Sequence, residues 1–151
     1  MLQESLGPGF TGRSVYRYDA ASQTLTREAL PHAAGLELVM VVDAGCHFSA
    51  DALAALQQDA ELRSRLLGAN LTLVTPPRSS IAYRFVAEWN AANPAIPMRI
   101  LYHAREWQAL DVAGVPEFYL FKDGKRVAEL SGWPAGGNKA ALLGLVDAAG
   151  K

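Results

Sequence analysis

The chain contains one cysteine, Cys46, and its neighbours decide what chemistry that thiol can perform. It opens the sequence Cys46-His47-Phe48-Ser49, which follows an apolar run and a short loop and begins a segment with helical periodicity. At a helix N-terminus, unpaired backbone N–H groups and the helix dipole favour an anion, so a thiol there is held as the nucleophilic thiolate. Ser49 stands where a Cys-x-x-Cys site has its second thiol. Its hydroxyl can donate a hydrogen bond to the thiolate but cannot resolve a mixed disulfide.

Two interpretations are open for each of the first two motif residues. Cys46 is either a reactive thiol or an inert, small apolar residue at the start of a helix. His47 either supplies positive charge that tunes the thiol or lies exposed on the helix without a role. A single cysteine forms no intramolecular disulfide, so it does not indicate the redox compartment.

A second motif places a proline directly before an apolar strand. It is Gly114-Val115-Pro116-Glu117-Phe118, and its proline follows Cys46 by 70 positions, from 46 to 116. An X-Pro bond at such a position is a candidate for the cis isomer. The backbone of Val115 would then turn outward near the start of the helix that carries Cys46. We therefore expect Val115 and Pro116 to border the thiol.

The elements that must position these motifs alternate between strands and helices. Apolar and β-branched runs predict strands at 15–18, 24–27, 36–42, 71–75, 98–102, 118–121 and 127–130. The first two and the last two of these form hairpins, and Asp123-Gly124 supplies the tight turn of the second. Helical periodicity predicts one long helix from 46 to 67, and further helices at 79–93, 104–110 and 138–148. This order predicts an α/β fold with a mixed central sheet and an N-terminal β-hairpin extension.

Composition limits the class of protein. The chain has 151 residues, of which 50% are hydrophobic and 19% charged, as is ordinary for one globular domain. We predict a flexible N-terminus at 1–12 and a single domain at 13–151. With 14 Lys and Arg against 15 Asp and Glu, the basic excess that nucleic-acid binding needs is missing. No apolar run reaches the length of a membrane span.

No cofactor or metal is expected. His32 and His103 lack ligand spacing with Cys46, and no phosphate-binding loop or catalytic carboxylate pair stands out. The three tryptophans lie beside apolar patterns and are expected to pack in the core or at its rim rather than to form a binding platform.

The order of the two motifs and their elements resembles the thioredoxin superfamily over about residues 36 to 149. The most specific part is Val-Pro-Glu-Phe-Tyr-Leu-Phe-Lys-Asp-Gly-Lys-Arg-Val at 115–127. The resemblance implies a thioredoxin-like fold in which Cys46 is the attacking thiol, Pro116 the cis-proline and Val115 a backbone partner for an extended substrate segment. The additional helix and strand at 79–102 look like the insertion of the TlpA/ResA branch. Members of that branch usually work outside the cytoplasm on protein thiols or in cytochrome maturation.

The chain departs from the family pattern at three positions. Ser49 replaces the resolving cysteine, Gly45 stands where tryptophan is usual, and Met40 occupies the place of a buried acid. The hypothesis is therefore an oxidoreductase with a single active thiol that forms mixed disulfides with protein thiols or glutathione. A second thiol must come from the substrate, from glutathione or from a separate reductase or resolving partner.

Other classes compete with this hypothesis. The main alternative is a redox-inactive binding module, a chaperone or assembly factor that docks extended peptides beside Pro116. A peroxide-reactive thiol is disfavoured, because Asp43 stands three residues before Cys46 where Thr or Ser is expected. The branch resemblance suggests a bacterial periplasmic or other extracytoplasmic setting. The cytoplasm is the alternative, since the first residues show no export signal.

Overall fold

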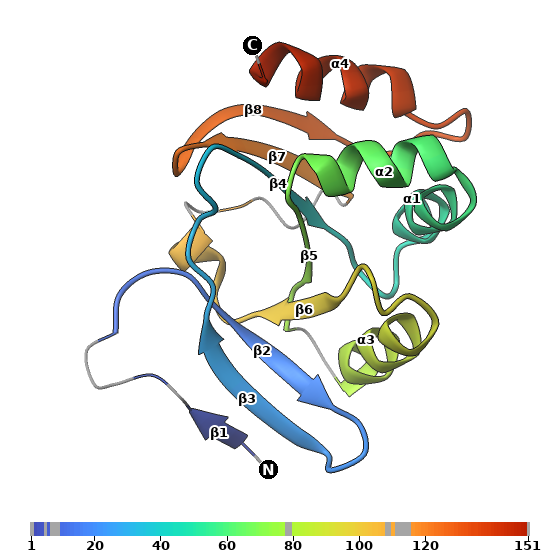
Figure 1. Cartoon of the computed structure of the whole chain (residues 1–151). Helices are drawn as coiled ribbons and strands as arrows, with labels where there is room; N and C mark the ends of the chain where they lie inside the picture. The colour runs from blue at the N-terminus through green and yellow to red at the C-terminus, as the bar shows by residue number, and fades with distance from the viewer. Residues whose placement is uncertain are drawn as a thin grey trace.

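A mixed eight-stranded β-sheet runs through the molecule (Figure 1). The structure is a computed structural model that describes residues 2–4, 6, 10–77, 80–107, 110 and 116–150. The strand order is β1-β3-β2-β6-β5-β4-β7-β8. The strands are β1 (Leu2–Glu4), β2 (Ser14–Asp19), β3 (Thr24–Ala29), β4 (Leu36–Val41), β5 (Leu71–Thr75), β6 (Met98–Leu101), β7 (Glu117–Lys122) and β8 (Lys125–Ser131).

The central strands are parallel and the outer hairpins are antiparallel. Strands β4, β5 and β6 pair in parallel, while β7 pairs with β4, β8 with β7, β2 with β6 and β3 with β2 in antiparallel fashion. Strand β1 adds in parallel to the free side of β3, inside the segment at 1–12. The predicted mixed sheet with an N-terminal hairpin extension is therefore confirmed.

The helices gather on one face of the sheet. They are α1 (His47–Gln58), α2 (Ala60–Gly68), α3 (Ser80–Ala92) and α4 (Lys139–Ala149), and all contribute to one core cluster (Figure 1). The opposite face is covered by the 3₁₀-helix η1 (Ala104–Trp107), whose Trp107 belongs to a second cluster. Among the described residues, no helix is long and apolar enough to cross a membrane.

Strand β4 lies between the two clusters. Leu38 and Met40 belong to the helix-side cluster, whereas Val39 and Val41 belong to the opposite one. A strand covered on both faces must be apolar at every position, which explains the continuous apolar run there. The strand predicted at 36–42 is thus confirmed as a central strand.

The predicted long helix from 46 to 67 is wrong in one respect: the chain breaks it at Asp59. This residue has extended backbone angles (φ −100°, ψ 102°), so helical hydrogen bonding stops there. Its carboxylate accepts a hydrogen bond from the N–H of Leu62 at 3.0 Å, which caps the new helix α2. The result is two helices, α1 and α2, in place of one.

The remaining elements agree with the sequence to within a few residues. The turn of the β7–β8 hairpin has positive φ at Asp123 (51°) and Gly124 (82°), as a two-residue hairpin turn requires. The helix predicted at 104–110 is the 3₁₀ turn η1, with 108–109 outside the described residues. The three tryptophans are buried, which confirms that they pack in the core.

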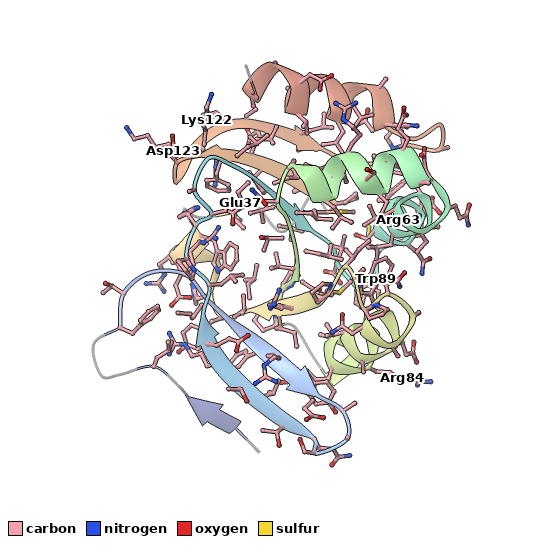
Figure 2. All side chains as sticks on the ribbon, in the orientation of Figure 1. Glu37, Arg63, Arg84, Trp89, Lys122 and Asp123 are labelled. Carbon is pink, nitrogen blue, oxygen red and sulfur yellow. The ribbon has the colours of Figure 1, made fainter. Side chains whose placement is uncertain are left out.

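A buried ion pair fastens the N-terminal hairpin to the centre of the sheet. The Arg13 guanidinium donates to both carboxylate oxygens of Glu37, at 2.9 and 2.8 Å, and both side chains are almost fully buried (Figure 2 labels Glu37). Arg13 also lies over the ring of Trp107, 4.2 Å from its centroid. Nδ1 of His32 lies 3.1 Å from Oε1 of Glu37. The segment before β2 is therefore tied to β4.

Candidate functional site

Cys46 is the residue that caps the N-terminus of α1. It follows the carboxyl end of β4 and has extended backbone angles (φ −105°, ψ 118°). Its carbonyl accepts the first helical hydrogen bond, from Ala50 N–H at 3.1 Å, but its side chain makes no capping hydrogen bond. The residue is half-buried. The thiol is therefore both at a helix N-terminus and within reach of solvent.

The next two side chains leave the core. His47 is exposed, and Phe48 is 41% exposed although it is large and apolar. Their ring centroids lie 3.9 Å apart. Both stand in the first turn of α1, directly after Cys46, and present their rings to solvent there.

Ser49 faces inward, unlike its neighbours. It is fully buried, and its Oγ accepts a hydrogen bond from the backbone N–H of Asp43 at 3.1 Å. This bond closes the loop between β4 and α1 and so fixes where the helix begins. The expected donation from the Ser49 hydroxyl to the Cys46 thiolate stays a prediction.

The second motif reaches the same end of the sheet as Cys46. The first residue of β7, Glu117, is paired with Val41, the last residue of β4. Pro116, which directly precedes β7, is buried, and its carbonyl accepts a hydrogen bond from Gly132 N–H at 2.7 Å. Val115 lies outside the described residues, so its expected contact with substrate stays a prediction.

A buried carboxylate strengthens this end of β7. Glu117 is 3% exposed, and Ser131 Oγ donates to its Oε2 at 2.6 Å. Together with the Pro116–Gly132 bond, this contact holds the start of β7 against the end of β8. Sequence reasoning missed the role of Glu117, because a single carboxylate at the start of a strand carries no distinguishing signal.

An apolar hollow of about 530 Å³ opens beside the first turn of α1. It lies between Phe48 and the loop that follows β8, and its described lining residues are Phe48, Ser131, Gly132, Trp133, Pro134, Ala135 and Asn138. The prediction that Trp133 packs in the core or at its rim is confirmed. The sequence did not predict that Trp133 and Phe48 line the same hollow. That juxtaposition depends on where α1 starts relative to the end of β8.

The histidines considered for a metal site have other partners. His32 is bonded to Glu37, and Nδ1 of His103 accepts a hydrogen bond from Arg105 N–H at 3.1 Å. Among the residues that the structure describes, no three His, Cys, Asp or Glu side chains form a group that could hold a metal ion.

Comparison with known proteins gives similarity in structure but not in sequence. No model of a protein family matches the chain, and no curated protein matches it. Among solved structures, a thioredoxin-like protein from Porphyromonas gingivalis, described as uncharacterized, superposes with a TM-score of 0.58 at 13% identity. That match covers 93% of this chain and 90% of the other.

Two further structures extend the comparison. A putative thiol:disulfide interchange protein DsbE from Chlorobium tepidum has a TM-score of 0.53 at 15% identity, over 97% of this chain and 100% of that one. The bacterioferritin comigratory protein of Xanthomonas campestris, described with alkyl peroxide reduction activity, has a TM-score of 0.52 at 13% identity, over 92% of each chain.

These similarities, together with the sheet order and the position of Cys46, define the class of this molecule. It is a protein of thioredoxin-like fold, as the two motifs predicted. At such low identities the likeness shows the fold alone, and fold does not determine activity. What the chain does must be argued from its own site.

Proposed function

We propose that this protein is a thiol-disulfide oxidoreductase of the thioredoxin superfamily that acts through one thiol, Cys46. The observation that carries the proposal is the position of that thiol: half-buried, at the N-cap of α1. The N–H groups of the first helical turn favour a thiolate there. A thiolate that solvent can reach is the nucleophile of disulfide exchange.

The exchange needs two steps, both balanced in sulfur and electrons. The Cys46 thiolate attacks one sulfur of a substrate disulfide, forms a mixed disulfide and releases the other sulfur as a thiolate. A second thiolate, from the substrate, from glutathione or from a separate partner protein, then attacks the substrate sulfur of the mixed disulfide. This step releases Cys46 as a thiolate. Ser49 cannot perform it, because a hydroxyl does not exchange with a disulfide.

The other motif residues assist the proposed disulfide exchange. Ser49 donates a hydrogen bond to the thiolate, and His47 supplies positive charge at the helix start. Pro116, as the cis-proline, and the backbone of Val115 align an extended substrate segment beside Cys46. The common position of Cys46 and Pro116 at one end of the sheet supports this arrangement.

We place the protein in the TlpA/ResA branch and in an extracytoplasmic, periplasmic setting. The support is topological: helix α3 and strand β6 stand between β5 and the segment that leads to Pro116, as in the insertion of that branch. One structural neighbour is described as a thiol:disulfide interchange protein, which agrees with the proposed reaction class.

Intact-mass analysis tests the proposal. The folded protein is incubated with an oxidised model peptide disulfide or with oxidised glutathione, and the product is quenched with acid. We expect one covalent adduct on the wild-type protein and none on the Cys46→Ser variant. An adduct that forms only after the chain is unfolded in urea would overturn the proposal.

A second candidate function is a redox-inactive docking module for extended peptides. The apolar hollow beside Phe48 favours it, because docking needs a surface and no thiol. The two functions differ in one measurement. A docking module binds a cysteine-free peptide equally well as wild type and as Cys46→Ser, and it forms no adduct.

A further inference from the structure

The antiparallel pairing of β2 with β6 stops before β2 ends. Val15 pairs with Leu101 and Tyr16 with Ile100, whereas the pairing of β2 with β3 continues as far as Asp19. The described residues of β2 that follow Tyr16 therefore run beside β6 without being paired with it. A gap opens in the sheet at this point, between the last residues of β2 and the start of β6.

The side chain of Asn90, on α3, takes the place of β2 in this gap. In the register of the two strands, Tyr18 would pair with Met98. Instead, Met98 N–H donates to Oδ1 of Asn90 at 2.7 Å, and Nδ2 of Asn90 donates to the Met98 carbonyl at 3.1 Å. Every second residue of an antiparallel strand points its N–H and C=O to the same neighbour, and the carbonyl of Ser14 accepts from Tyr102 N–H on the β6 side. The N–H and C=O of Tyr18, four residues further along β2, therefore point into the gap.

The gap forms a cleft of about 480 Å³, which we call the β2–β6 cleft. Helix α3 lies alongside the end of β2 and closes one side of it (Figure 1). The apolar part of the cleft is formed by Ala87, Ala91, Pro94, Pro97 and the buried Met98. Small side chains and prolines leave room there, so an apolar side chain that entered would gain free energy from burial.

Two arginines give the cleft its charge. Arg17 and Arg99 both line it, and they face each other in the register of β2 and β6, where like charges repel. Glu28 contacts both: its Oε2 lies 3.4 Å from Nε of Arg17, and its Oε1 lies 3.9 Å from Nε of Arg99. Oδ1 of Asp19, the third charged lining residue, accepts two N–H groups of the β2–β3 turn. One carboxylate thus serves two guanidiniums, and a second carboxylate would find charged N–H donors between them.

We propose that the β2–β6 cleft binds the C-terminal end of a partner polypeptide whose last residue is apolar. Arg17 and Arg99 donate to the terminal carboxylate, and the Tyr18 carbonyl accepts the N–H of the last residue. The last side chain fills the apolar part of the cleft. An internal segment of a chain lacks the carboxylate, and a charged last side chain would lose its hydration among alanines and prolines. This site does not use Cys46, so it is independent of the proposed disulfide exchange.

Binding of short labelled peptides tests the proposal. Two probes have the sequence Gly-Ser-Ala-Phe with fluorescein on the N-terminus, and one of them ends in a free carboxylate and the other in an amide. A third probe, Gly-Ser-Ala-Asp, has a free carboxylate and a charged last side chain. By fluorescence anisotropy, we expect the Kd of the Phe peptide with the free carboxylate to be at least about tenfold lower than that of either other probe, because only this peptide satisfies both parts of the cleft.

Substitutions at the lining separate the two parts of the cleft. Arg17→Gln and Arg99→Gln each remove a charged donor and should bring the ratio of the amide Kd to the carboxylate Kd closer to one. Ala91→Trp fills the apolar part from an exposed helix position and should weaken the binding of both Phe peptides. Arg84→Gln is the matched control, because Arg84 is an exposed arginine of α3 that is not among the described lining residues (Figure 2). It should leave the ratio unchanged.

Three outcomes would overturn the proposal. The first is an equal Kd for the carboxylate and the amide, or a ratio that both Arg17→Gln and Arg99→Gln leave intact. The second comes from phenylpropionate, a free acid without a peptide chain: if it displaces the labelled peptide at concentrations as low as the unlabelled peptide does, the cleft does not recognise a polypeptide end. The third is a loss of peptide binding in Cys46→Ser, which should bind all three peptides as wild type does.

Discussion

At the scale of single residues, the site contains an accessible thiol, Cys46, and a buried hydroxyl, Ser49. Cys46 and Ser49 stand one helical turn apart, but only Cys46 is reachable from solvent. Ser49 stabilises the loop between β4 and α1, because its Oγ accepts a hydrogen bond from Asp43 N–H. Under the proposed function, a site with one thiol would keep a mixed disulfide long-lived unless another thiol arrives.

Replacing Ser49 with cysteine should restore intramolecular resolution. If the side chain at position 49 faces the Cys46 sulfur as proposed, a thiol there has a high effective concentration, and the lifetime of the adduct should fall by at least about tenfold. Mass spectrometry of the adduct over time measures this, and the oxidised Ser49→Cys protein should lack two hydrogens. Ser49→Ala, which adds no thiol, is the control. An adduct equally persistent in Ser49→Cys would show that position 49 does not face the sulfur.

At the scale of elements, the break between α1 and α2 depends on Asp59. The hydrogen bond from Lys139 and then that from Leu62 N–H lower the pKa of Asp59 below its ordinary value of 3.8. Lys139, at the start of α4, lies 2.8 Å from Asp59 Oδ2 and 2.7 Å from Glu61 Oε1. Asp59 therefore both caps α2 and joins it to α4.

The contact between Asp59 and Lys139 predicts how the stability of the fold changes with pH. A carboxylate whose pKa is lowered in the folded state stabilises the fold above its unfolded pKa, and the contribution is lost as the pH falls through the folded pKa. The Asp59→Asn variant keeps a good capping residue but removes the charge. We expect the free energy of unfolding of this variant to be lower than that of wild type near neutral pH. The difference between the two should become smaller below about pH 4.

Urea unfolding of wild type and Asp59→Asn at a series of pH values measures this difference in free energy of unfolding. The same substitution in a Lys139→Met background provides the control, since the partner charge is then absent and the effect should be smaller. A gap that stays constant from neutral to acidic pH would contradict the contribution of the ion pair.

The break at Asp59 is also the feature at this scale that the sequence did not predict. Apolar residues recur on both sides of the break, at Leu53, Leu56, Leu62 and Leu66, and all four are buried in the same core. This recurrence, with no Gly or Pro between the four leucines, predicts one helix. A lone aspartate is compatible with both a helix interior and an N-cap, and only the packing of α2 against α4 decides between them.

At the scale of the whole molecule, the Arg13–Glu37 pair joins the N-terminal hairpin to the central strand. Removing one charge of a buried pair leaves the other without compensation, so Glu37→Gln should lower the free energy of unfolding by about 3–5 kcal/mol. Glu88→Gln is the matched control, because Arg84 and Glu88 form an exposed pair on α3 and its loss should cost less than about 1 kcal/mol. Equal losses in the two variants would contradict the structural role of the buried pair.

The molecule as a whole was largely predictable from its sequence, and the exceptions are long-range. The strands other than β1, the hairpin turn at Asp123-Gly124 and the helix start at Cys46 follow from local patterns, because turn chemistry and periodicity act over a few residues. The Arg13–Glu37 pair and the Phe48–Trp133 hollow join segments far apart in the chain. Their side chains carry no local signal, and only the tertiary packing brings them together.

Alkylation of Cys46 by iodoacetamide tests most directly whether the fold activates this thiol. At one fixed pH near neutral, we expect the folded protein to react about tenfold faster than the chain unfolded in urea, because the N–H groups at the helix N-terminus favour the thiolate. The difference between the two rates should narrow in Ser49→Ala. A folded-state rate at or below the unfolded-state rate would contradict a reactive Cys46 and favour the docking module.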